Sequence, residues 1–266
     1  LNSYKKIRRK GTMLYYNQYV RAESLDEAYT LYQKKNNFIL AGMLWQKMRN
    51  RTMGTAIDLC ALGLDQVDET ETEFRIGAYV SLRELETNER LNVYTEGAFR
   101  ESVRHIVGVQ FRNVATVGGS LWGRFGFSDV MTIFRALGAK VELHHAGIMD
   151  LDEFVRLPRK TRDILVAVIV PKTVEKVVYL SQRNQSTDFP VLTVAVSDCG
   201  GVKKAVIGAR PGIAKLYEIE RMDKETAERL AEETPFQSNM RASEAFRRHL
   251  AGVLLGRAFA EIQGKE

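Results

Sequence analysis

The 266-residue sequence has few cysteines and prolines and no long apolar run. Two cysteines, Cys60 and Cys199, are too few for a disulfide framework or for a Cys-ligated iron–sulfur cluster. Five prolines and the lack of low-complexity tracts exclude a disordered linker protein. The sequence contains no run of about 18 apolar residues, so no membrane span is predicted. Leu1 to Thr12 lacks the apolar segment of a secretory signal, so we expect a cytoplasmic protein.

Several widespread functional motifs are also missing. The sequence has no Walker-type loop and no GxGxxG motif that opens a helix, so an ordinary Rossmann dinucleotide site is not predicted. It has no GxSxG elbow of the kind that carries a nucleophilic serine. His105, His144 and His145 do not form a metal-ligand spacing with either cysteine, and we predict no metal site.

The net charge of +6 is concentrated at the start of the chain. The first ten residues contain no acid and five positive charges, namely Lys5, Lys6, Arg8, Arg9 and Lys10. The remainder of the chain therefore carries a net charge of only +1. A nucleic-acid-binding face is therefore not expected. We interpret residues 1–12 as a disordered basic extension, because Met13 opens a stretch that resembles a natural beginning.

Hydrophobic periodicity and turn residues predict an α+β protein of more than one compact unit. Ser24 with Glu27 is typical of a capping box at the start of a helix, and Gly200-Gly201 indicates a hairpin turn. The predicted strands are Tyr16–Val20, Phe38–Ala41, Thr55–Leu59, Phe74–Ala78, Lys140–His144, Ile164–Val170, Val177–Ser181, Val191–Asp198 and Val202–Ala209. The predicted helices include Leu82–Glu86, Ala98–Val107, the helix that follows Asp129, Glu225–Glu233 and Ala242–Ile262.

The most unusual stretch of the sequence is glycine-rich and aromatic, from Phe111 to Asp129. Gly118-Gly119 follows a short β-branched run, and a tight turn there would expose amide groups that suit a diphosphate. Nearby hydroxyl and carboxylate groups could bind a sugar or ribityl chain, namely those of Thr116, Ser120, Ser128 and Asp129. Three aromatic rings could contact a flat ring system, namely those of Trp122, Phe125 and Phe127. A Gly-Gly pair is also common in plain hairpin turns, so the pattern alone leaves both interpretations open.

The segment Arg112-Asn113-Val114-Ala115-Thr116-Val117-Gly118-Gly119-Ser120 closely resembles the second flavin-binding motif of molybdenum-hydroxylase FAD subunits. These are the medium subunits of xanthine dehydrogenase, aerobic carbon monoxide dehydrogenase and their relatives. Further matches follow in the same order along the chain: Tyr19–Ala28, Ile57–Leu59, Arg75–Ala78, Ile164–Pro171 and Asp188–Val196. The resemblance extends from Met13 to about Ile262.

The resemblance implies a PCMH-type FAD-binding domain of two subdomains at residues 13–171, divided at about 66/67, and a small α+β C-terminal domain at 172–266. FAD is expected between the subdomains. The family's first motif reads A-G-G-T-D/S-L, whereas Ala41-Gly42 is followed here by Met43-Leu44-Trp45, so the second glycine is absent. The expected flavin contacts are Gly42, Met43, Leu44, Trp45, Thr116, Gly118, Gly119, Ser120, Ser128 and Asp129. Arg183 is a loose candidate for a basic residue that the family places near the flavin.

By resemblance, the chain is an oxidoreductase subunit that needs partners. A large molybdopterin-binding subunit would oxidise the substrate, an iron–sulfur subunit would carry the electrons, and FAD would pass them to NAD or another acceptor. The alternative is a flavin-free assembly scaffold of the same complex, which the altered first loop suggests. A stand-alone flavin oxidase is less favoured, because the chain is short for a substrate-binding domain.

Overall fold

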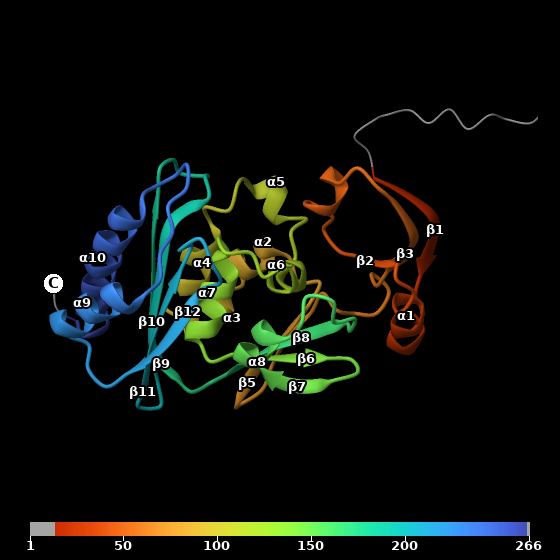
Figure 1. The fold of residues 1–266 in the computed structure, drawn as a ribbon. Coiled ribbons are helices and arrows are strands. Elements are labelled where there is room, and N and C mark those ends of the chain that lie inside the picture. The colour runs from red at the N-terminus through yellow and green to blue at the C-terminus, as the bar shows by residue number, and fades with distance from the viewer. Residues whose placement is uncertain (1–13, 265–266) are drawn as a thin grey trace, which may run out of the picture.

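The computed structural model describes residues 14–264, so the basic extension predicted for residues 1–12 lies outside the described part. Three sheets lie side by side along the molecule, with the N-terminal part at one end and the C-terminal part at the other (Figure 1). Helices and strands both contribute throughout, which confirms the predicted α+β class. In the described part, no helix is long and apolar enough to cross a membrane.

The N-terminal sheet is parallel and has the order β1-β3-β2. Its elements are β1 (Tyr15–Arg21), α1 (Leu25–Tyr32), β2 (Phe38–Leu40), η1 (Gln46–Met48) and β3 (Thr52–Asp58). The predicted cap is present, because the Glu27 amide donates to Ser24 Oγ at 3.1 Å. The Glu27 carboxylate accepts from the Glu23 amide at 2.8 Å, one residue before the position expected for a capping box.

The middle sheet is antiparallel and has the order β4-β5-β8-β6-β7. Its strands are β4 (Val67–Glu69), β5 (Glu73–Gly77), β6 (Lys140–Leu143), β7 (Gly147–Asp150) and β8 (Leu165–Pro171). The helices between them are α2 (Leu82–Thr87), α3 (Glu89–Tyr94), α4 (Ala98–Val103), α5 (Val109–Arg112), α6 (Val117–Gly123), α7 (Asp129–Ala136) and α8 (Leu151–Arg156).

The helix predicted to reach Val107 ends instead at Val103. Val107 has a φ of +51°, which lies in the left-handed region and cannot continue a right-handed helix. The apolar spacing of this segment predicts a longer helix, because Ile106 and Val107 extend the same pattern.

The C-terminal sheet is antiparallel, has the order β12-β11-β10-β9, and is covered on both faces. Its elements are β9 (Val174–Arg183), β10 (Pro190–Cys199), β11 (Val202–Gly208), β12 (Lys215–Ile219), α9 (Lys224–Glu233) and α10 (Glu244–Ile262). Val194 and Val196 join the core beneath α9 and α10, whereas Ala195 joins the core beneath α4 and α7. The hairpin predicted at Gly200-Gly201 is confirmed, with φ values of +61° and +86°.

One arginine ties the N-terminal part to the middle part. The Arg162 guanidinium, just before β8, donates to the carbonyls of Tyr32, Lys34, Lys35 and Asn37 at 2.6–3.3 Å. It also lies 4.1 Å from the centre of the Tyr32 ring. Arg162 therefore fixes the turn between α1 and β2. Strand β2 leads directly into the first loop, residues 41–45.

A buried ion pair holds the end of α5, just before the segment that leads into α6. Arg112 Nε lies 2.7 Å from Glu86 Oε2, and Arg112 Nη2 lies 3.1 Å from Oε1. Arg83 reaches the same carboxylate at 2.9 Å. Burial would raise the pKa of Glu86, but the hydrogen bonds from Arg112 and Arg83 outweigh it, and the pKa lies below its ordinary value of 4.5.

We expect Glu86→Gln to cost about 3 kcal/mol of stability at neutral pH, because it leaves Arg112 buried without a counter-charge. A carboxylate whose pKa is lowered in the folded state stabilises the fold when the pH is above its ordinary pKa. This stabilisation is lost as the pH falls through the folded-state pKa. Urea unfolding from pH 7 to pH 3 should therefore show the gap between wild type and variant narrowing below about pH 4.5. A gap that is constant with pH would contradict the ion-pair account.

Candidate functional site

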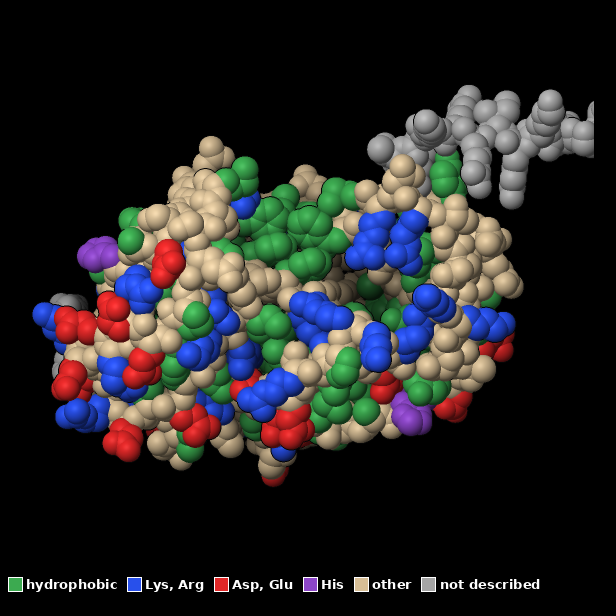
Figure 2. Space-filling view, viewed as in Figure 1, with side chains coloured by type: hydrophobic (Ala, Val, Ile, Leu, Met, Phe, Trp, Pro, Cys, Tyr) green, Lys and Arg blue, Asp and Glu red, His purple; other side chains and the backbone are tan. Residues whose placement is uncertain are grey.

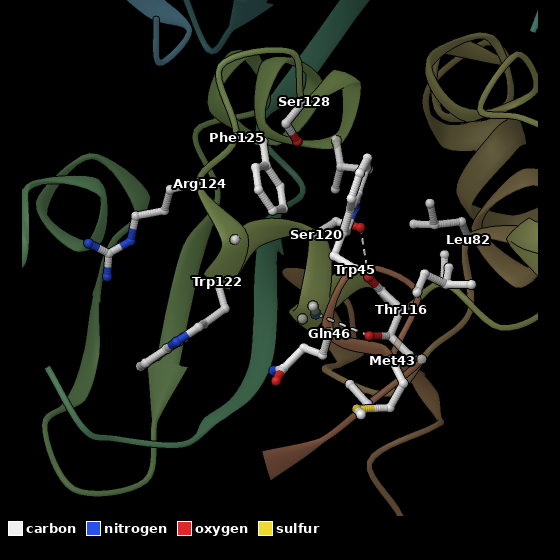
Figure 3. Close-up of a pocket in the computed structure, with 18 of the residues that line it drawn as sticks. Met43, Trp45, Gln46, Leu82, Thr116, Ser120, Trp122, Arg124, Phe125 and Ser128 are labelled. Carbon is white, nitrogen blue, oxygen red and sulfur yellow. Dashed lines mark hydrogen bonds between the residues drawn. The ribbon is translucent and has the colours of Figure 1, made fainter. Parts of the chain in front are cut away.

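A cavity of about 660 Å³ lies where the three parts of the molecule meet, a volume in the range of small-molecule and cofactor sites (Figure 3). All ten residues predicted as flavin contacts line this one cavity: Gly42, Met43, Leu44, Trp45, Thr116, Gly118, Gly119, Ser120, Ser128 and Asp129. They come from the loop after β2, from α6, and from the start of α7. The fold thus brings together residues that are up to 87 positions apart, from Gly42 to Asp129.

The cavity wall carries a small excess of positive charge. Arg49, Arg124, Arg159 and Arg183 line it together with Asp129, Asp163 and Asp188. Figure 2 shows Lys and Arg side chains gathered over the middle and N-terminal parts of the molecule in this view. Arg159 donates to the carbonyls of Gly123 and Arg124 at 2.7 and 2.8 Å, which holds it beside the end of α6. An anionic ligand such as a diphosphate suits this setting.

The first loop, residues 41–45, packs directly on the backbone that precedes α6. A Cβ on Gly42 would lie 2.1 Å from the Val114 carbonyl oxygen, a distance that no side chain can tolerate. The need for glycine at this position is therefore one of close backbone approach. Within the described part of the chain, the amide groups of Gly42, Met43, Leu44 and Trp45 donate no hydrogen bond. In the described part, these four consecutive amides thus have no protein acceptor, and the residues that carry them line the cavity.

Met43 occupies a backbone conformation that favours glycine. Its φ is +58°, in the left-handed region, at the position where the resemblance leads one to expect the second glycine. Its side chain packs against the small core around Phe38, Met53 and Ala56. The loop therefore keeps the glycine-type backbone course although the glycine itself is absent.

The strain at Met43 can be measured against a matched control. Met43→Gly and Met43→Ala both remove the side chain, but only alanine keeps the cost of about 1–2 kcal/mol for a left-handed residue. Glycine's greater freedom in the unfolded chain offsets about 0.4–1 kcal/mol of that difference. We expect the glycine variant to be more stable than the alanine variant by about 0.5–1 kcal/mol in urea unfolding. An alanine variant more stable than the glycine variant by about 0.4–1 kcal/mol would show that the loop carries no strain at this position.

The twin glycines do not form the open turn that the sequence suggested. Thr116 caps α6, and Gly118 and Gly119 lie in the first turn of that helix. The Gly118 amide donates to the Ala78 carbonyl at 2.8 Å, and the Gly119 amide donates to Thr116 Oγ1 at 3.0 Å. Both amides are thus engaged, because the cap and the segment after β5 use them. The open amides lie in the first loop instead.

Gly118 still has a steric function. A Cβ at this position would lie 2.7 Å from both the Cβ and the carbonyl oxygen of Ala78. The Val117 amide also pairs with the Val80 carbonyl at 2.9 Å. Glycine therefore allows α6 to lie against the segment that follows β5, and this contact sets the position of the cavity wall.

Ser120 and Ser128 serve the helices from which they come. Ser120 Oγ donates to the Thr116 carbonyl at 2.8 Å (Figure 3). Ser128 caps α7, and its Oγ accepts from the Met131 amide at 3.0 Å. Both hydroxyls border the cavity and retain acceptor capacity for a ligand.

Asp129 is buried in an ion pair that joins the middle part to the C-terminal part. Its Oδ1 accepts from the Arg183 guanidinium and, at 2.5 Å, from the Tyr179 hydroxyl. Burial raises the pKa of Asp129, and the Arg183 charge opposes that rise. Burial and the Asp129 carboxylate raise the pKa of Tyr179 well above its ordinary value, so the phenol stays protonated as a donor. Arg183 and Asp129 both line the cavity.

An aromatic cluster forms another wall of the cavity. Its members are Trp45 of the first loop, Phe125 and Phe127 before α7, and Phe189 before β10. Trp45 lies 5.5, 5.8 and 5.9 Å from the ring centres of Phe125, Phe127 and Phe189. Figure 3 shows Trp45 beside Phe125 among the residues that line the cavity. Offset and tilted contacts at such distances are favourable for aromatic rings.

Many residues that line the cavity were not predicted as site residues from the sequence, and Tyr79 and Phe189 are two of them. Tyr79 donates its hydroxyl to the Leu40 carbonyl and so anchors the end of β2 where the first loop begins. Phe189 comes from the C-terminal part, which the flavin motifs do not include. The position of Tyr79 directly after the I-G-A strand was the available signal. No local pattern distinguishes Phe189 from a core aromatic residue.

Comparison with known proteins places these observations in a family context. A sequence model described as the FAD binding domain in molybdopterin dehydrogenase matches residues 13–173. An uncharacterized protein of Escherichia coli K12, YgfM, is 25% identical over 255 residues, covering 92% of this chain and 96% of its own length. The glyceraldehyde dehydrogenase medium chain of Sulfolobus acidocaldarius is 25% identical over 275 residues, covering 92% of this chain and 97% of its own length.

Solved structures share the fold over almost the whole chain. A chain of reconstituted CO dehydrogenase from Oligotropha carboxidovorans superimposes with a TM-score of 0.80 at 22% identity, covering 96% of this chain and 99% of that one. A chain of quinoline 2-oxidoreductase from Pseudomonas putida 86 gives a TM-score of 0.77 at 18% identity, covering 94% and 97%. At these identities the likeness concerns the fold.

Proposed function

The chain belongs to the family of FAD-binding domains in molybdopterin dehydrogenases, and from this premise we propose that it is the electron-transferring FAD subunit of a multi-subunit molybdenum hydroxylase. The observation that carries the proposal is the cavity of about 660 Å³ in which all ten expected contact residues meet. Its position between the first loop and α6 agrees with a cofactor that lies between two subdomains, at residues 13–66 and 67–171.

The residues present fit FAD. Amide groups of residues 42–45 that have no partner in the described part suit the diphosphate, and Arg49 and Arg159 add positive charge to the wall. The hydroxyls of Ser120 and Ser128 suit the polar chain of the cofactor. The aromatic cluster of Trp45, Phe125, Phe127 and Phe189 suits a flat ring.

FAD, when bound, supplies the redox chemistry, whereas the protein positions the cofactor and sets its surroundings. Gly42 and Gly118 hold the two walls at the separation that the cofactor needs, because any larger residue would force the backbones apart. Arg183 and Asp129 lock the C-terminal part against α7 at the edge of the cavity. No residue of this chain is required as a general acid or base.

We propose that the chain works with an iron–sulfur subunit and a large molybdopterin-binding subunit, and that FAD passes electrons to NAD or another acceptor. Support comes from the name of one relative, a dehydrogenase medium chain, which denotes one chain among several. The chain's two cysteines agree with clusters held elsewhere. Among the described residues, no group of acidic, histidine or cysteine side chains could hold a metal ion.

A second candidate is a scaffold that assembles the complex without flavin. The left-handed backbone at Met43 is the observation that favours it, because the strained residue lies in the loop assigned to the diphosphate. Both candidates predict the same partners, and they differ only in the cofactor.

Purification of the tagged full chain from its native cells tests the proposal. The material should contain partner chains, molybdenum, iron and FAD, with FAD in equal amount to the chain. Molybdenum and iron without FAD would favour the scaffold. Recovery of the chain alone, free of both metals under conditions that preserve complexes, would contradict both candidates.

A further inference from the structure

Trp45 packs against three aromatic rings and remains partly exposed where it lines the cavity. Three phenyl rings contact it, those of Phe125, Phe127 and Phe189, and the Phe189 ring is nearly parallel to it at an interplanar angle of 28°. Yet 38% of the Trp45 surface remains exposed, and the residue lines the cavity. A large aromatic ring that packs on other rings and remains partly exposed in a cavity can bind a second flat ring.

The supporting rings come from separate parts of the chain. Phe125 and Phe127 are stacked on each other at 5.1 Å and 9°, and Phe127 lies 4.4 Å from Phe189. Phe189 lies beyond residue 173, the last residue that the family's sequence model matches. The wall is thus complete only when the C-terminal part is docked, and both the Arg183–Asp129 ion pair and the core shared by α4, α7 and the C-terminal sheet hold it there.

We propose that Trp45 is the stacking platform for the isoalloxazine ring of the bound flavin. This inference rests on the proposed function and assigns one part of the cofactor to one side chain. FAD contains two flat systems, and the wall of four aromatic rings offers more apolar area than the smaller adenine would cover. Polar groups border the same wall, since Asp129 follows Phe127 by two residues and the Arg183 guanidinium donates to the carbonyl of Asp188, which precedes Phe189.

Stacking on an indole has a direct optical consequence. The chain has two tryptophans, Trp45 and Trp122, so Trp122→Phe leaves Trp45 as the sole reporter. Trp122 packs on Phe154 and Arg124, outside the four-ring cluster, and it also lines the cavity. The matched variant Trp45→Phe leaves Trp122 as reporter and keeps an aromatic ring at position 45.

The experiment titrates both variants of the full chain with FAD, FMN and ADP, and follows tryptophan emission together with flavin retention on dialysis. FAD and FMN should quench Trp45 saturably and more completely than they quench Trp122, because stacking adds to the energy transfer that reaches both tryptophans. ADP, which lacks the isoalloxazine, should quench neither. Trp45→Leu should weaken FMN binding about tenfold, whereas Trp45→Phe should retain most of the affinity.

Quenching of Trp45 by ADP but not by FMN would overturn the assignment in favour of adenine. Retention of FAD with unchanged Trp45 emission, or equal FMN affinity in Trp45→Leu and wild type, would also overturn it, while leaving the proposed function intact. Failure of the wild-type chain to retain any flavin would overturn the proposed function as well. Circular dichroism of each variant separates these outcomes from misfolding.

Discussion

Gly42→Ala is expected to weaken FAD binding by about 10- to 100-fold while leaving the fold intact. The added Cβ would meet the carbonyl oxygen and carbon of Val114 at 2.1 and 2.9 Å and the Cα of Ala115 at 3.3 Å. These are backbone atoms, which cannot rotate away as a side chain could. The first loop must therefore move outward, and losing a hydrogen bond to the charged diphosphate costs about 1.5–3 kcal/mol, which is about 10- to 100-fold in affinity.

The matched control for this variant is Gly256→Ala. Gly256 lies within α10, and a Cβ there would meet nothing within 4 Å. Alanine favours helix over glycine, so this variant should bind FAD normally and be more stable by up to about 1 kcal/mol. Isothermal titration calorimetry of both variants provides the comparison. Wild-type affinity in Gly42→Ala would show that the contact between the first loop and Val114 does not shape the site.

Arg183→Met is expected to destabilise the protein by about 3–5 kcal/mol, because it leaves the buried Asp129 carboxylate without its counter-charge. The loss should depend on pH with a definite sign. Burial raises the pKa of Asp129, and the variant removes the arginine that opposes this rise. A carboxyl with a raised folded-state pKa favours the fold below the ordinary pKa, and this contribution is lost as the pH rises. The variant should therefore be weakest, relative to wild type, at neutral and alkaline pH.

The double variant Arg183→Met with Asp129→Asn separates charge from packing. Removing the carboxylate together with the arginine should restore part of the stability and abolish the added pH dependence, because no buried charge remains at this position. Urea unfolding at pH 5 and pH 8 measures both effects. If the double variant were less stable than Arg183→Met at both pH values, the ion pair would not be the interaction that joins the two parts.

The elements with local causes could be predicted from the sequence. The capped start of α1, the Gly200-Gly201 hairpin and strands β9, β10 and β11 of the C-terminal sheet follow from side-chain alternation and turn residues. The family resemblance predicted the fold and the cofactor, because the segment from Arg112 to Ser120 is specific. That segment also pointed to Thr116 and Ser120, and both line the cavity.

The conformation of the twin glycines could not be read from the sequence. Glycine disfavours helix, so Gly118-Gly119 indicated a turn. The helix forms because Thr116 caps it and because the Val117 and Gly118 amides pair with the segment after β5. These pairing partners lie about 40 residues earlier in the chain, and tertiary contact outweighs the local preference.

The contribution of the C-terminal part to the cavity wall could not be predicted from the sequence for a similar reason. Arg183 pairs with a residue 54 positions away, and Phe189 contacts rings from two other segments. Strand β12 was also missed; it is a short edge strand whose neighbours are supplied by β11. In each case the determining contact is distant in sequence, and periodicity reports only on neighbours.

The most direct test of the central claim is a crystal structure of the full chain grown with FAD. The account predicts that the diphosphate oxygens accept hydrogen bonds from the amides of residues 42–45, with the ring system against the aromatic cluster. A cofactor bound elsewhere, or a diphosphate that makes no contact with the first loop, would contradict it.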